Sequence, residues 1–324
     1  DDIEMTNLQQ LLNESDFNDT IDIVEYRLKK ENIDPKRDYY INDNHKIGNL
    51  KNKNNSDINV YTINHGQYVN CLRLSLTNPE FILEKEFLFM THNRSMKSHR
   101  LGLLCLLKKY DILDNVDWSL LRGSVLKNMF NEYDIFAEWF FSNVFSDEIT
   151  TSLKNEIKYF ADLGNRKSKY EQDYDVDIGE WGFDWNKTFE MNHHSNSYIN
   201  IVGESQFEFE DVVHITEKSI IPFHYSQFPI IAATHEHIRT MRGVFGFDFF
   251  DDLIDHSYDD EKDVKKRFKM IFNEILRLHK NKDEVIKFYK ESRHRFKNNK
   301  EKVLEITKDK TDTVFFKNLI NKKH

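Results

Sequence analysis

The sequence predicts an α/β protein with two Rossmann-like domains, helical insertions and a helical carboxyl-terminal segment. Two short strand signals near the amino terminus, a strand–turn–helix signal at 85–110 and a β-α-β-α succession at 198–250 support this prediction. A chain of 324 residues also exceeds one typical core and suits two α/β domains. We expect a small domain over 1–82, a larger one with a helical insertion over 83–282, and a basic helical segment over 283–324.

The predicted amino-terminal domain begins with apolar residues at helical spacing over 1–30. Strands are predicted at 38–41 and 58–63, on either side of a polar connection with turn-forming residues. Strand, connection and strand together form the start of a Rossmann-like fold.

The clearest early strand covers 85–90 and is followed by a polar turn at 91–95 and a helix at about 98–110. In α/β folds this succession brings backbone N–H groups and polar side chains to the carboxyl edge of the sheet. Residues 124–170 then predict mainly helix.

The central part of the chain repeats the pattern. Residues 198–203 predict a strand, and a short apolar stretch leads into Thr216 and a helix. Pro222 lies in the first turns of that helix, where proline is tolerated. Residues 228–232 form a continuously apolar run, which is typical of a buried strand, and a short helix is predicted at 235–242.

The carboxyl-terminal part is predicted to be helical after one more short strand at 247–250. An amphipathic helix is expected at 263–280 and a basic helix at about 284–298. A basic helix with interleaved aromatic residues can contact an anionic glycan, a membrane surface or DNA. We favour the simpler interpretation, in which the aromatic side chains pack on the core.

Composition excludes several classes of protein. The net charge is −9, and an acidic surface repels phosphates, so nucleic acid is not the expected partner. No apolar run reaches the roughly 18–20 residues that span a bilayer, and the acidic amino terminus does not resemble a secretory leader. With two cysteines the chain has no disulfide framework and fits a reducing compartment. We therefore expect a cytoplasmic protein, in the host cytoplasm if it is viral.

The tripeptide Thr216-Glu217-Lys218 lies where a strand meets the start of a helix. Thr216 can cap the helix, and the N–H groups of such a helix end favour a phosphate. Lys218 opposes the helix dipole, which is understandable if it faces a diphosphate, and Glu217 can accept from both ribose hydroxyls. The alternative is a capped helix with two solvated charges, which for a tripeptide taken alone is the commoner outcome.

The residues around this tripeptide resemble the donor-binding core of the α-1,3-fucosyltransferases. That family has a strand ending in Glu-Asn-Ser, a Thr-Glu-Lys that opens a helix, and a proline-containing strand, and the matching segments are 199–205, 213–218 and 228–231. Residues 93–101 and 245–258 are similar to uncharacterised phage and marine-bacterial proteins that carry the same Thr-Glu-Lys block. The resemblance implies a GT-B fold, a GDP-fucose donor and inversion of the anomeric centre.

Position by position, the resemblance implies that Glu217 binds the ribose and Lys218 the diphosphate, with Arg94 or Arg100 as the second phosphate cation. The family's Glu-Asn-Ser is present here as Glu204-Ser205, without the asparagine, so the resemblance leaves the exact contacts to the ribose or sugar open.

Arg94 and Arg100 also fit this chemistry independently of any resemblance. A leaving nucleoside diphosphate needs its developing charge neutralised, and metal-free transferases do this with Arg, Lys and a helix N-terminus. A guanidinium grips two oxygens at once. Asn93 belongs with them because polar groups between a strand end and a helix are often functional in α/β folds. The alternative is that His99 and Arg100 are ordinary surface residues on a helix.

The catalytic base is expected to come from the first domain. Inversion requires a carboxylate or histidine that takes the proton of the acceptor hydroxyl. His65, just after a predicted strand, is the candidate, with Asp43 and His45 as alternatives. A lone histidine in such a place is more often structural or solvent-exposed.

No metal site is predicted. Asp173 and Asp175 have the Asp-x-Asp spacing of metal-dependent transferases, but they lie in a polar stretch with no strand before it. The histidines at 193–194 and 235–237 lack the separation that places two zinc ligands on one helix face.

These patterns together predict a metal-independent, inverting glycosyltransferase. It would move a sugar from a GDP- or UDP-linked donor to a hydroxyl of a glycan or another acceptor, with no further cofactor. Two alternatives stay open. One is a nucleotide-binding or assembly protein with a degenerate transferase site, and the other is a phage DNA glycosyltransferase, against which the net charge argues.

Overall fold

The computed structural model describes residues 40–42, 60–62, 78–93, 97–120, 140–164, 166, 192–208 and 213–308. The chain divides into two compact units, Asp1–His65 with Phe209–His214, and Gly66–Glu208 with Ile215–His324. The fold is α/β, and its main element is a four-stranded parallel sheet in the second unit. The predicted domain boundaries, at 82–83 and 282–283, stay predictions.

The first unit contains a pair of parallel strands, β1 (Tyr40–Asn42) and β2 (Val60–Thr62), with Tyr40 opposite Val60. The residues that connect these two strands lie outside the described part of the chain. Both strands overlap the predicted ones. The helix predicted at 1–30 lies outside the described residues.

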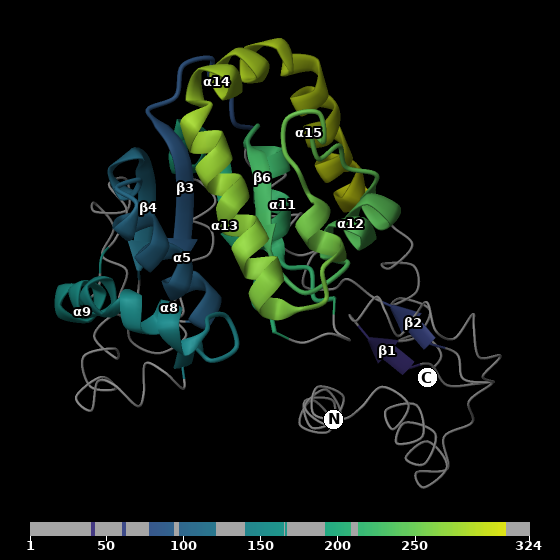
Figure 1. Ribbon diagram of the computed structural model, residues 1–324. Helices are drawn as coiled ribbons and strands as arrows, with labels where there is room; N and C mark the ends of the chain where they lie inside the picture. Colours follow the sequence, from purple (N-terminus) through teal and green to yellow (C-terminus); the bar gives the residue numbers. More distant parts are fainter. Residues whose placement is uncertain are drawn as a thin grey trace, which may run out of the picture. The chain divides into compact units, whose positions relative to one another are not determined.

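The sheet of the second unit has the order β4-β3-β5-β6, with every neighbouring pair parallel. Figure 1 labels β4, β3 and β6 of this sheet. Its strands are β3 (Phe87–Asn93), β4 (Val116–Leu120), β5 (Ser197–Gly203) and β6 (Phe228–Ala232). The chain steps from β3 to β4 in one direction, and β5 then pairs with the other side of β3. The strand order therefore reverses between β3 and β5. All residues of β5 and β6 are buried, as expected for parallel strands covered on both faces.

Two crossover helices shape the carboxyl edge of this sheet. α5 (Ser98–Lys109) joins β3 to β4, through the short 3-10 helix η1 (Leu113–Asn115), and α11 (Glu217–His224) joins β5 to β6. Between β4 and β5 lie α8 (Asp147–Ser152), α9 (Lys154–Leu163) and the 3-10 helix η3 (Asn192–Asn196).

Helices dominate the chain after β6. They are α12 (His237–Phe245), the 3-10 helix η4 (Ser257–Asp260), α13 (Val264–Lys280), α14 (Lys282–Glu291) and α15 (Arg293–Lys308). In Figure 1, α13 crosses in front of the sheet. Polar side chains cap two of the predicted helices: the Thr216 hydroxyl accepts from Lys218 N–H at the start of α11, and the Asp263 carboxylate accepts from Lys266 N–H at the start of α13.

The helices α14 and α15 pack aromatic side chains against the amino end of the sheet. Tyr289 and Phe296 are fully buried, and both contact Phe228, the first residue of β6. Tyr289 also packs edge-on against Tyr198, the second residue of β5. The interpretation that the basic segment packs its aromatic residues on the core is confirmed for these side chains.

Two elements differ from the prediction. The strand predicted at 247–250 is wrong, because these residues form a loop in which Phe250 has φ 60°. The apolar run is explained by burial, since Phe247 stacks on Phe223 and Phe250 packs on Phe296. In contrast, β4 was not predicted. The polar residue Asp117 interrupts the apolar run that would indicate a buried strand, yet all five residues of β4 are buried.

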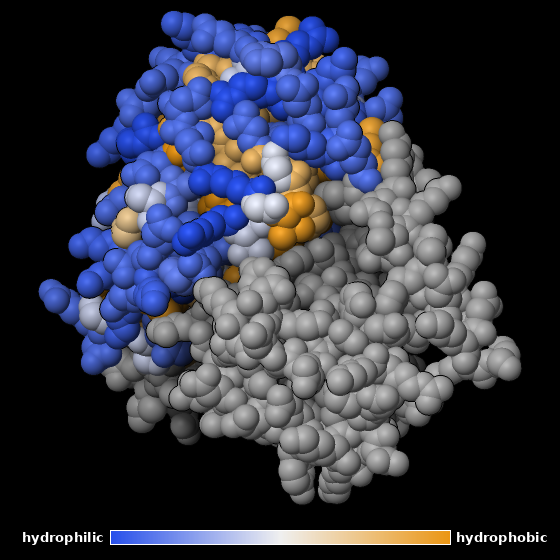
Figure 2. Space-filling view, turned by 90° about the vertical axis from the view of Figure 1, so that its right-hand side faces the viewer, coloured by the Kyte–Doolittle hydropathy of each residue, from blue (hydrophilic) through white to orange (hydrophobic). Residues whose placement is uncertain are grey.

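The described surface in Figure 2 is mostly hydrophilic, with hydrophobic side chains visible between the polar ones. None of the helices in the described part of the chain combines the length and the apolar character needed to cross a membrane.

Candidate functional site at the carboxyl edge of the sheet

The carboxyl ends of β3 and β5 form the candidate site. In open α/β sheets, ligands bind outside the carboxyl ends of the strands where the strand order reverses, and that point lies between β3 and β5. Met90 is level with Asn200, and the same register continued by three residues brings Asn93 level with Gly203. The predicted site residues gathered here are called the carboxyl-edge cluster: Asn93, Arg100, Glu204, Thr216, Glu217 and Lys218.

Arg100 reaches from α5 to the end of β5. Its Nε donates to the Gly203 carbonyl at 3.0 Å, and Nη2 donates to the Glu204 carbonyl at 3.0 Å. A Cβ atom on Gly203 would lie 2.7 Å from Arg100 Cγ, so the close approach requires glycine. Burial lowers the pKa of Arg100, while the nearby carboxylates of Glu204 and Glu217 raise it. Arg100 is therefore a held, buried cation and not a surface residue.

Asn93 is the last residue of β3 and is buried. Its Nδ2 donates to Thr91 Oγ1 at 3.2 Å, and its backbone N–H donates to Ser119 Oγ at 3.3 Å. The side-chain oxygen of Asn93 is buried with no hydrogen-bond partner in the described part of the chain. A buried acceptor without a donor is costly, which makes this atom a suitable contact for a ligand that enters at the strand end.

Glu204 follows β5 directly, and its carboxylate is fully buried beneath the start of α11. Oε1 accepts from Thr216 N–H at 3.0 Å and from Ser219 Oγ at 2.6 Å, and Oε2 accepts from Ser205 N–H at 2.9 Å. Thr216 Oγ1 lies 2.9 Å from both oxygens. The sequence predicted that Glu204 contacts the nucleotide sugar, but here its carboxylate bonds to protein groups and organises the site from within.

These hydrogen bonds favour the ionised form of Glu204. Burial by itself raises the pKa of this carboxyl group. The positive charges of Lys218 and His237 and the hydrogen bonds from Ser219 and Ser205 outweigh burial and lower the pKa to about 2. At neutral pH a negative charge therefore lies under the amino end of α11.

Glu217 and Lys218 form the outer part of the carboxyl-edge cluster. Lys218 Nζ lies 2.7 Å from Glu217 Oε1 and 3.3 Å from Thr216 Oγ1. The Lys218 side chain is 30% exposed and that of Glu217 is 10% exposed. Of the two cations of the cluster, Lys218 is thus the one within reach of a solvent-borne ligand.

The amino end of α11 differs from the helix end that the sequence predicted. Thr216 N–H donates to Glu204, and Lys218 N–H donates to the Thr216 hydroxyl at 3.3 Å. These two N–H groups already have protein acceptors, so they are not open to a phosphate in this structure. The capping role of Thr216 is confirmed. An anion at this edge would be bound mainly by side chains.

Three residues of the site were missed by sequence reasoning. His99 is buried, its Nε2 bonds to the Glu204 carbonyl at 2.9 Å, and burial followed by the charge of Arg100 lowers its pKa to about 3. Ser219 bonds to Glu204, and His237 Nε2 lies 3.0 Å from Ser219 Oγ. No local pattern signals these contacts, because the partners are separated by 15 to 105 residues.

Other predicted residues lie outside the described part of the chain. These are the candidate base His65 with its alternatives Asp43 and His45, the second candidate phosphate cation Arg94, and the aspartates of the Asp-x-Asp pattern. Their roles stay predictions. In the described residues, no group of three or more His, Cys, Asp or Glu side chains is arranged to hold a metal ion.

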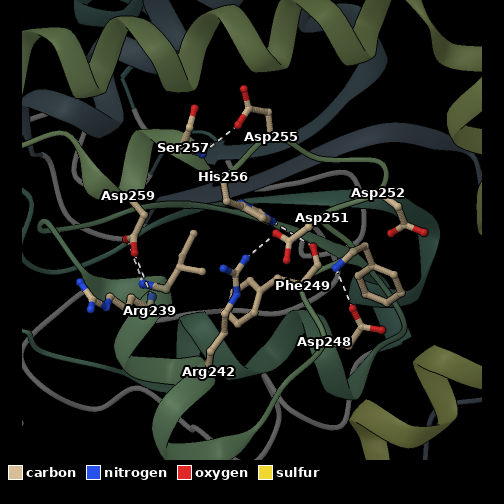
Figure 3. Close-up of polar contacts among 12 residues, drawn as sticks. Arg239, Arg242, Asp248, Phe249, Asp251, Asp252, Asp255, His256, Ser257 and Asp259 are labelled. Carbon is tan, nitrogen blue, oxygen red and sulfur yellow. Dashed lines mark hydrogen bonds and ion pairs between the residues drawn. The ribbon is translucent and has the colours of Figure 1, made fainter.

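A separate cavity of about 390 Å³ lies between α12, η4 and α13 and shares no residue with the carboxyl-edge cluster. Its polar lining comprises Arg242, Asp251, Asp255, His256, Ser257, Asp260 and Arg277. Figure 3 shows that several of these groups bond to their neighbours, with Arg242 paired to Asp251 and Asp255 accepting from Ser257 N–H at 2.9 Å. Its charged groups are therefore largely paired within the protein.

Neither a protein-family model, a curated protein nor a solved structure matches this chain. The functional assignment therefore depends on the chemistry of the carboxyl-edge cluster.

Proposed function

We propose that this chain is a glycosyltransferase whose second unit binds a nucleotide sugar at the carboxyl-edge cluster. The observation that supports this most is the gathering of Arg100, Glu217 and Lys218, from two crossover helices, at the reversal point of a parallel sheet. A GT-B arrangement, with the first unit as the acceptor-side domain, and a cytoplasmic location belong to the same proposal.

The charges of the carboxyl-edge cluster suit a diphosphate. Lys218 has the accessible ammonium group, and its present partner is a carboxylate on the adjacent residue. A diphosphate would attract Lys218 away from Glu217, and the Glu217 carboxylate can accept from the ribose hydroxyls. Arg100 adds a buried positive charge behind them, and fixed cations of this kind stabilise a leaving diphosphate without a metal ion.

The proposed reaction is a single displacement. The acceptor hydroxyl oxygen forms a bond to the anomeric carbon while the bond from that carbon to the diphosphate oxygen breaks, and the configuration inverts. The hydroxyl proton goes to a base, for which His65 is the candidate. The products are the glycosylated acceptor and the free nucleoside diphosphate.

Nucleotide binding tests the proposal directly. A thermal-shift screen with GDP, UDP, CDP, ADP and dTDP identifies the preferred nucleotide, and calorimetry then measures its Kd. Lys218→Ala and Glu217→Ala each remove a charged hydrogen bond, and we expect affinity losses of about tenfold to hundredfold with little change in Tm.

A matched control is available on α15, where Lys297 and Glu301 form another ion pair, at 3.8 Å and well exposed. Lys297→Ala and Glu301→Ala should bind the nucleotide like the wild type. Unchanged affinity in the Lys218 and Glu217 variants would remove the carboxyl-edge cluster from the proposal.

A turnover assay separates the enzyme from its alternatives. Release of sugar from the preferred nucleotide sugar, to water or to an acceptor, supports the transferase. Tight nucleotide binding with no sugar release under any acceptor identifies a binding or assembly protein. Strong DNA binding that weakens with salt would point to a DNA glycosyltransferase.

A further inference from the structure

The buried carboxylate of Glu204 determines the direction of the hydrogen bonds around it. An ionised carboxylate only accepts hydrogen bonds, and a hydroxyl has a single proton to donate. Ser219 Oγ lies 2.6 Å from Glu204 Oε1, so its proton points to Glu204. Ser219 must then accept at its other contact, and His237 Nε2, at 3.0 Å, must be the protonated nitrogen.

Thr216 has the same relation to Glu204 from the other side. Its hydroxyl lies 2.9 Å from both carboxylate oxygens and shares its one proton between them, so it accepts from the backbone N–H and the ammonium group of Lys218. A continuous series of donors therefore converges on Glu204. One branch starts at His237 and passes through Ser219, and the other starts at Lys218 and passes through Thr216.

His237 is well placed to act as a fixed donor. It is buried, it is the first residue of α12, and its own N–H donates to the Thr234 carbonyl at 3.3 Å. The Asp259 carboxylate accepts from the next two backbone N–H groups, of Ile238 and Arg239, at 2.9 Å each (Figure 3). The beginning of α12 is thus held on η4, and His237 enters the network from an anchored helix end.

We propose that His237 is a positioning residue of the donor site, which acts through Ser219 and Glu204 to hold Thr216 and Lys218 in their binding arrangement. This inference rests on the proposed function. It assigns a role to α12, which has no residue in the carboxyl-edge cluster. Without the histidine donor, Ser219 can rotate away from Glu204, and the carboxylate loses its shortest hydrogen bond.

The test compares His237→Leu with His237→Gln. Leucine retains volume but has no N–H group, whereas the glutamine amide can donate to Ser219. With the preferred nucleoside diphosphate as the probe, we expect His237→Leu to weaken binding about tenfold and His237→Gln to restore it to within about threefold of the wild type. Rescue by glutamine is a result that a purely space-filling role would not produce.

His256 supplies the matched control. It is also buried, and one ring nitrogen bonds to the Phe249 carbonyl at 2.9 Å (Figure 3). The other ring nitrogen lies 3.0 Å from Tyr258 Oη. His256→Leu should lower Tm to a similar extent while leaving the nucleotide Kd unchanged. Equal loss of affinity in both leucine variants, or no advantage of glutamine over leucine at position 237, would overturn the inference.

Ser219→Ala covers the case in which His237→Leu does not fold, because it interrupts the same network with a smaller change of volume. Weakened nucleotide binding by folded Ser219→Ala supports the inference, and wild-type binding overturns it. If Lys218→Ala loses nucleotide binding while His237→Leu binds normally, the positioning role of His237 is rejected and the proposed function is retained. Absence of nucleotide binding by the wild-type chain would reject the proposed function and the inference with it.

Discussion

The two ends of the parallel sheet are built differently. At the amino end, Tyr289 and Phe296 from the last two described helices pack on Phe228 and Tyr198, and apolar contact predominates. At the carboxyl end, a buried carboxylate accepts hydrogen bonds from Ser205, Thr216 and Ser219. The same sheet thus has one end held by apolar burial and another organised by charge.

The two ends therefore suit different roles, the amino end in stability and the carboxyl end in ligand binding. Aromatic packing stabilises in proportion to buried area and tolerates small shifts in position. A buried carboxylate is favourable only while its donors stay in place, because an unpaired buried charge is very costly. The carboxyl end is therefore sensitive to geometry, as a binding site for a charged ligand must be.

Phe296→Ala should produce the largest loss of stability. The side chain is fully buried among Phe81, Phe228, Phe250 and Tyr289, and removal of a buried phenyl ring costs about 3–5 kcal/mol. Urea denaturation measures this loss. If the carboxyl edge is independent of this packing, the folded variant binds nucleotide like the wild type. A loss below about 1 kcal/mol would show that the amino end is not stabilised by this packing.

Glu204→Gln should produce the next largest effect, and the effect should depend on pH. The pKa of Glu204 is about 2 in the folded protein, so between the ordinary glutamate value and pH 2 the folded state binds fewer protons than the unfolded state. The carboxylate contributes about 3 kcal/mol above pH 5, and this contribution is lost as the pH falls towards 2. Urea denaturation at pH 7, 5 and 3 should show the difference between wild type and variant shrinking with acidity. A difference independent of pH would contradict the buried anion.

Gly203→Ala probes the packing between Arg100 and the strand end. The new Cβ atom would lie 2.7 Å from Arg100 Cγ, and relief of this clash should cost about 1–3 kcal/mol and displace the guanidinium. Nucleotide affinity should fall with stability. Gly243, inside α12, has no atom within 4 Å of its added Cβ, so Gly243→Ala should be neutral or slightly stabilising and should bind normally. Equal stability and equal nucleotide affinity of the two alanine variants would show that Arg100 does not need its close approach to Gly203.

Arg295→Ala should have the smallest effect, although the geometry of its ion pairs is good. The guanidinium makes two hydrogen bonds to Asp248, at 2.6 and 2.7 Å, and two to Asp252. The side chain is 21% exposed and that of Asp252 is 55% exposed, so solvent screens the pairs. We expect a loss of about 1 kcal/mol that diminishes in 1 M salt. A larger loss of stability that does not depend on salt would show that ion pairs, and not aromatic packing, stabilise the amino end of the sheet.

Much of the second unit could be predicted from local patterns. The strands β3, β5 and β6 each contain mainly apolar stretches, and α13 has a clear amphipathic period, so each was placed within a few residues of its observed bounds. The loop at 247–250 was predicted as a strand, because a run of buried aromatic residues has the same sequence pattern as a strand. The strand β4 was not predicted, because its buried polar residues break that pattern.

The candidate site was predicted only in part. Thr216 was predicted as a cap because a helix start has a local signature. Glu217, Lys218 and Arg100 were predicted from the resemblance of the flanking segments together with their charges and their places at strand and helix ends. His99, Ser219 and His237 were not found. Their importance comes from contacts across two or three elements, and no sequence spacing encodes those contacts.

The sequence by itself determined that β3, β5 and β6 are strands and where the helices α11 and α13 begin, because hydrophobic pattern and capping act over a few residues. Only the tertiary structure decided that the Glu204 carboxylate faces inward and takes its donors from Thr216, Ser219 and Ser205. The physical reason is that a buried charge is stable only where several elements supply hydrogen bonds at once, and that coincidence exists only in the folded chain.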